Sequence, residues 1–129
     1  MKKMKRGIAV CFSTMLLFGM ALDVCAGSGT YRSNEIIVGY GSSVTSNSGY
    51  AYTSIAGGGT GTASVSAEYH SHYNGNYKEA PVQTGNSTNG TAASLSFGPA
   101  TGCSSSYINA THNATVGGTT IPTQTSSGS

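Results

Sequence analysis

The chain has 129 residues and a formal net charge of +2, with six Lys and Arg against four Asp and Glu. Only 8% of the residues are charged, and four of the six basic ones lie within the first six positions. Later cations are too few to form the basic surface that displaces counterions from nucleic acid, so we expect no nucleic-acid partner. The N-terminal segment and the remainder must therefore be considered separately.

The first 26 residues have the order of a secretory signal peptide. Residues 1–6 carry four positive charges, residues 7–22 are uncharged and largely apolar, and a short segment then ends at Ala26. We predict a signal helix over 1–26 that is cleaved between Ala26 and Gly27, with Val24 and Ala26 recognised by the peptidase. The protein would contact the membrane only before cleavage, and would then be secreted, extracellular or associated with the cell envelope.

Two alternatives to cleavage after Ala26 remain open. The segment could stay as a membrane helix, but its uncharged run of 16 residues is shorter than the roughly 20 needed to span the hydrocarbon core. It could also be a lipoprotein signal with Cys25 acylated, because Leu22 has the required spacing. In that signal, however, Val24 occupies a position that favours a small residue.

Cleavage would leave 103 residues with a net charge of −1, enough for one small domain. Gly, Ser and Thr supply 51 of them, whereas large aliphatic residues and phenylalanine supply only twelve. Disordered chains usually combine low hydrophobicity with high net charge, which is absent here. Because all eight tyrosines lie in this part and bury a large area each, we predict a thin, tyrosine-rich core.

Alternating apolar and polar residues predict β-strands. In 63–73, Ala63, Val65, Ala67 and Tyr69 would face one side and Glu68 the other. Similar alternation covers 107–116 and 93–97, and weaker candidates cover 35–40, 48–55 and 81–84. Turn residues separate them, including 57–59, 74–76, 85–86, 89–90 and 117–118. We predict an all-β antiparallel β-sandwich of about six to seven strands over 35–121, flanked by flexible segments at 27–34 and 122–129.

The mature chain lacks the motifs of most enzymes. Asp23 is the only aspartate, so aspartate-rich calcium loops and a triad with Asp are excluded. There is no G-x-S-x-G motif, phosphate loop or C-x-x-C motif. Cys103 is the one cysteine after the signal; we expect a half-buried thiol there, although pairing between chains stays open. We predict a non-enzymatic protein.

Glu68, His70 and His72 form the one ordered polar group. On a strand these alternate residues share a face at intervals of roughly 6–7 Å. Imidazole binds zinc and copper, so the three side chains are a candidate metal site, and otherwise no cofactor is expected. The alternative is a solvated polar face without metal, because no fourth ligand is evident. His112 alternates with apolar residues and is predicted to be a core histidine.

The segments Ser106-Tyr107 and Thr111-His112-Asn113-Ala114-Thr115-Val116 resemble the lactococcin-type β-sandwich bacteriocins. These are small secreted proteins with strands rich in Gly, Ser, Tyr and His, and the resemblance implies interference with cell-wall synthesis in competing bacteria. The family carries tryptophans, whereas this chain has none. The composition is also similar to that of uncharacterised small exported bacterial proteins rich in Ser, Gly, Thr and Tyr.

These observations favour a secreted β-protein that acts by surface contact, in binding, adhesion or envelope assembly. Its partner would be a cell-surface or envelope component, or a second copy of the chain that pairs through a strand edge. Two alternatives stand beside this prediction. One is a bacteriocin that antagonises related bacteria, and the other is a secreted metal-binding protein that uses Glu68, His70 and His72.

Overall fold

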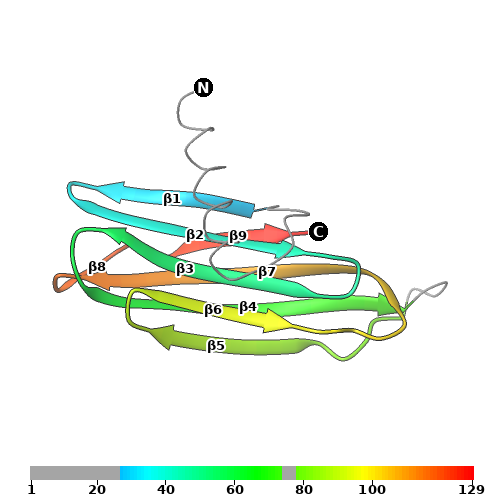
Figure 1. The fold of residues 1–129 in the computed structure, drawn as a ribbon. Helices are drawn as coiled ribbons and strands as arrows, with labels where there is room; N and C mark the ends of the chain where they lie inside the picture. Colours follow the sequence, from blue (N-terminus) through cyan, green and yellow to red (C-terminus); the bar gives the residue numbers. More distant parts are fainter. Residues whose placement is uncertain (1–26, 74–77) are drawn as a thin grey trace, which may run out of the picture.

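A computed structural model of the chain describes residues 27–73 and 78–129. The predicted signal helix, with Val24 and Ala26, lies outside these residues. Nine strands make up the regular structure of the described part (Figure 1): β1 (Gly27–Ser33), β2 (Ile36–Val44), β3 (Gly49–Gly57), β4 (Gly61–Tyr73), β5 (Gln83–Asn89), β6 (Ala92–Phe97), β7 (Cys103–Val116), β8 (Thr119–Thr120) and β9 (Gln124–Gly128). Within the same residues, no helix has the length and hydropathy needed to cross a membrane.

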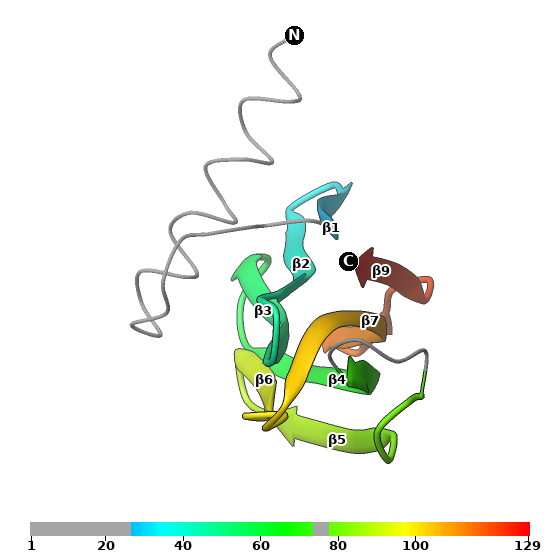
Figure 2. The ribbon, with the colours of Figure 1, turned by 90° about the vertical axis from the view of Figure 1, so that its right-hand side faces the viewer.

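The strands form two antiparallel sheets, which confirms the predicted all-β fold. The first sheet has the order β1-β2-β3-β6. The second has the order β5-β4-β7, and both β8 and β9 pair with the far edge of β7. Viewed along the strands, the sheets face each other, with β1 near β9 on one side and β5 near β6 on the other (Figure 2).

Both segments that we expected to be flexible contain strands instead. In the 27–34 segment, β1 pairs with β2 along its whole length through a tight turn, where Asn34 adopts a positive φ of 52°. Asparagine tolerates this left-handed conformation better than most residues. In the 122–129 segment, β9 pairs with β7. Neither strand shows an apolar alternation, because both contain mainly Gly, Ser and Thr. The predicted turn at 85–86 was wrong for the same reason: these residues lie inside β5, which is equally rich in small polar residues.

The core lies between the sheets and follows the predicted alternation. Inward residues of β4 and β7 are almost completely buried, including Ala63, Val65, Ile108 and Val116. Tyr69 fills the centre, and its ring stacks on that of Phe97 with centroids 5.8 Å apart. At the periphery Cys103 is a free, half-buried thiol that packs against this core.

Two buried tyrosines lie outside this core. Tyr50 and Tyr52 are only 3% and 2% exposed, but their side chains lie on the outer face of the first sheet, opposite the inward residues Ala51 and Thr53. Tyr52 covers Gly41, and the two tyrosine rings lie 6.2 Å apart. Burial raises the pKa of Tyr50 to about 12. The tyrosines are therefore placed on both faces of the first sheet rather than in the core alone.

Gly49 allows the first sheet to approach the core tyrosine closely. A Cβ atom at position 49 would lie 2.6 Å from Cδ2 of the Tyr69 ring. We predict that Gly49→Ala lowers the free energy of unfolding by about 1–3 kcal/mol, as measured by urea denaturation, because the buried ring must shift. Gly90→Ala is the matched control, since a Cβ there has no neighbour within 4 Å. Equal stability of the two variants would contradict this packing.

Candidate functional site

The outer face of the second sheet carries polar side chains almost exclusively. Because β4 and β7 bury one set of alternate residues, the other set faces outward. Residues that are direct partners in neighbouring strands lie on the same face, so the residues of β5 and β9 that pair with this outward set also face outward. We call this surface the polar face; its residues are Thr84, Asn86, Thr88, Ser64, Ser66, Glu68, His70, His72, Ser105, Tyr107, Asn109, Thr111, Asn113, Thr115, Thr125 and Ser127. Hydroxyl and amide groups dominate it.

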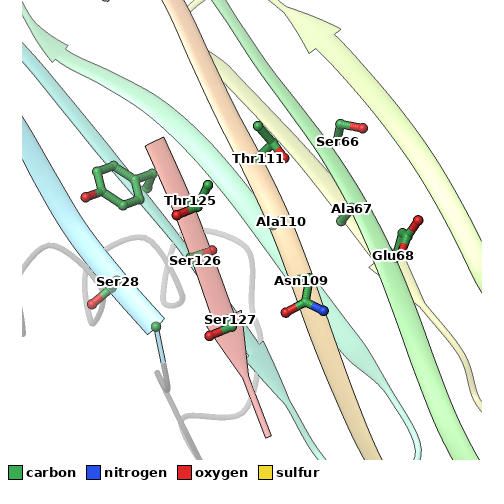
Figure 3. A pocket seen from close by; sticks show the side chains of 12 residues that line it. Ser28, Ser66, Ala67, Glu68, Asn109, Ala110, Thr111, Thr125, Ser126 and Ser127 are labelled. Carbon is green, nitrogen blue, oxygen red and sulfur yellow. The ribbon is translucent and has the colours of Figure 1, made fainter. Parts of the chain in front are cut away.

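A hollow of about 780 Å³ lies over β4, β7 and β9 and reaches the start of β1. Figure 3 shows Ser66, Glu68, Asn109, Thr111, Thr125 and Ser127 around it. Gly27 allows β1 to approach β9 here, because any Cβ at this position would collide with the Ser127 carbonyl oxygen. Glu68 supplies the carboxylate, with 62% of its side chain exposed.

A second hollow of about 390 Å³ adjoins the first at Asn109 and Ser127, which line both. Tyr107 is the aromatic residue that lines this second hollow, together with Gly128 and Ser129. The two hollows thus form one polar depression with an aromatic ring at one end.

The three predicted metal ligands share the polar face, as their spacing indicates, but other contacts engage them. His70 Nδ1 lies 2.5 Å from Glu79 Oε1, and His70 Nε2 lies 3.4 Å from Glu68 Oε2. The ring of His72 lies 6.3 Å from that of Tyr107. No group of three His, Cys, Asp or Glu side chains within 27–73 and 78–129 is placed to hold a metal ion. Zinc or copper binding by Glu68, His70 and His72 stays a prediction.

The partners of His70 were not evident from the sequence. Glu79 reaches it because an isolated bridge pairs residue 79 with His72. Tyr107 stacks on it because these two residues are direct partners in the β4–β7 register, with ring centroids 4.4 Å apart and an interplanar angle of 6°. Only the register between strands distant in sequence could have revealed this stack.

His112 is completely buried between the sheets, in line with the prediction of a core histidine. Its Nδ1 lies 2.9 Å from Thr53 Oγ1, and its Nε2 lies 2.7 Å from Ser126 Oγ, which also contacts Ser42 Oγ at 2.9 Å. Thr53 donates its own proton to the Ser64 carbonyl. Because the Thr53 hydroxyl proton is used there, Nδ1 of His112 donates to Thr53 Oγ1. This polar network connects both sheets.

The Ser126–His112 contact resembles the serine–histidine pair of hydrolases, and Ser126 also lines the large hollow. Two features argue against activation of this serine. In hydrolases a carboxylate orients the histidine, whereas here the hydroxyl of Thr53 takes that place. Burial also lowers the pKa of His112 to about 4, so the ring is a weak base. The contact is better explained as a polar connection inside the core.

Comparisons with known proteins identify no relative. No family model matches the chain, and neither the curated proteins nor the solved structures provide a match.

We predict that stability falls with acidification through His112. Burial lowers the pKa of His112 from 6.5 to about 4 in the folded state, so the unfolded chain binds more protons between these values. The free energy of unfolding should be highest above about pH 7 and fall by about 3 kcal/mol towards pH 4. Urea denaturation across this range measures it.

His112→Gln should remove most of this pH dependence, at the cost of lower stability at neutral pH. The described neighbours of the ring are hydroxyls, the Tyr52 backbone and the Tyr40 ring 5.2 Å away, so no other ionisable carboxylate or amine contacts it there. An equally steep decrease in both proteins would show that another group is responsible.

Proposed function

We propose that the exported protein acts without covalent chemistry, by contact between its polar face and a component of the cell envelope or of another cell surface. The observation that carries this proposal is the depression over β4, β7 and β9, where hydroxyl, amide and carboxylate groups converge. A volume of about 780 Å³ is within the usual range of roughly 300–1,000 Å³ for ligand sites.

The chemistry of the lining supports binding rather than catalysis. Ser66, Thr111, Thr125 and Ser127 offer hydroxyls that both donate and accept hydrogen bonds, and Asn109 offers an amide. These groups suit a partner that is itself rich in hydrogen-bonding groups. Among the residues that the structure describes, no Lys or Arg lines the hollows, so the lining does not favour strongly acidic partners.

Removing two hydroxyls from the depression should weaken envelope binding. We predict that Thr111→Val combined with Thr125→Val lowers retention of the purified mature protein on isolated envelopes of the producing cells about tenfold, since each lost hydrogen bond contributes about 0.5–1.5 kcal/mol. Valine keeps the shape and favours strands, so the fold should persist. Co-sedimentation measures retention.

Thr88→Val is the matched control, because Thr88 belongs to the polar face but lies outside the hollows. Parental retention by the double variant would argue against the proposal. The proposal would also be contradicted if the parent protein hydrolysed a simple ester and the Ser126→Ala variant did not.

A second candidate, an assembly role, is favoured by the open edge of β5. Among the described residues, β5 pairs only with β4, and its sequence from Gln83 to Asn89 contains no charge and no proline. Natural edge strands are usually protected by such residues. Antiparallel pairing of two β5 strands would join the second sheets of two copies.

We predict that the parent protein self-associates and that the double variant Asn86→Lys/Thr88→Lys is monomeric, because four like charges would meet at the paired edge. Light scattering after size-exclusion chromatography distinguishes the states. Thr120→Lys adds a charge on β8, at the opposite end of the second sheet, and should leave association unchanged. A parent that stays monomeric up to its solubility limit would exclude edge pairing.

A further inference from the structure

We propose that the ligand of the polar face is an uncharged, hydroxyl-rich sugar chain, bound with one sugar ring against Tyr107 and the next units along the depression. This inference rests on the proposed function and identifies the class of ligand that the same site would take. Three features support it: a fixed aromatic ring, a dense set of paired donors and acceptors, and the absence of cations from the lining.

Tyr107 is held as a stacking platform. His70 covers one face of its ring in a nearly parallel stack at 4.4 Å. On the other side, β9 pairs with β7 so that Gly128 lies opposite Ile108, next to Tyr107. The same register brings Ser129 beside Tyr107 on the polar face, and both residues line the second hollow, which leaves part of the ring accessible. An aromatic face that is fixed by one partner and open on the other side suits the apolar face of a sugar ring.

Hydrogen-bonding groups continue from this ring into the large hollow. Asn109 and Ser127 line both hollows, so a chain that passes from Tyr107 must cross them. Glu68 pairs with Asn109 across β4 and β7 and accepts hydrogen bonds, while Thr111 both donates and accepts. Strand spacing of roughly 4.8 Å places these groups at intervals comparable with one sugar unit. Sugar hydroxyls also both donate and accept, and would satisfy them.

Other ligand classes fit the lining less well. An acidic or phosphorylated ligand would meet the carboxylate of Glu68 with no lining cation to compensate. An apolar ligand would remove the hydroxyl and amide groups from water without giving them partners, which is unfavourable. A peptide strand would pair best with the β5 edge rather than with this face. The lining therefore favours a neutral sugar chain.

Chemically treated envelopes test the ligand class directly. Periodate cleaves sugars that carry neighbouring hydroxyls, whereas protease removes exposed protein. We expect periodate to lower retention of the full mature protein on isolated envelopes at least about tenfold, and protease to leave it unchanged. Loss with protease but not with periodate would overturn the sugar proposal, while the effect of Thr111→Val/Thr125→Val would still support surface contact through the polar face.

Variants test the role of Tyr107. Tyr107→Ala should lower retention on untreated envelopes about tenfold, as expected when a stacked ring is lost, while Tyr107→Phe should retain it. Tyr73→Ala is the matched control, because Tyr73 is 36% exposed but lies outside both hollows. Asn109→Ala compared with Asn86→Ala provides a second pair, because both residues are exposed but only Asn109 lines the hollows. Parental retention by both Tyr107→Ala and Asn109→Ala would overturn the proposed site.

Discussion

The antiparallel pairing of β4 with β7 determines both faces of the second sheet. Its register runs from Gly61 opposite Val116 to Tyr73 opposite Cys103. This register places Tyr69 beside Ile108 in the core and His70 beside Tyr107 on the polar face. A shift by one residue would exchange the two faces, exposing the core residues and burying the hydroxyls. The fold and the candidate site therefore depend on the same set of backbone pairs.

A core with few large aliphatic residues needs other contacts between its layers. Tyr69 supplies apolar area and reaches across to Phe97, while His112 connects Thr53 of the first sheet with Ser126 of the second. The hydroxyls of Thr53 and Ser126 hydrogen-bond the uncharged imidazole, whereas the buried Tyr69 hydroxyl has no hydrogen-bond partner among the described residues. Because this contact between the sheets uses His112, the free energy of unfolding depends on protonation of that side chain. The outer surface can then carry polar groups.

Strong alternation made the central strands predictable, whereas the edges and the site partners were not. The faces of 63–73 and 107–116 could be read from apolar residues at every second position. β1, β5 and β9 contain mainly small polar residues, which look the same in a strand and in a loop. The stack of Tyr107 on His70 and the bond of His112 to Thr53 join residues far apart in sequence, so only the register between strands brings them together.

Nuclear magnetic resonance mapping with solubilised envelope fragments tests contact through the polar face most directly. Binding there should shift the signals of Asn109, Thr111 and Ser127 and leave those of Ser54 and Ser94 in the first sheet unchanged. Shifts concentrated on the first sheet, with none around the depression, would contradict the assignment of this face as the binding surface.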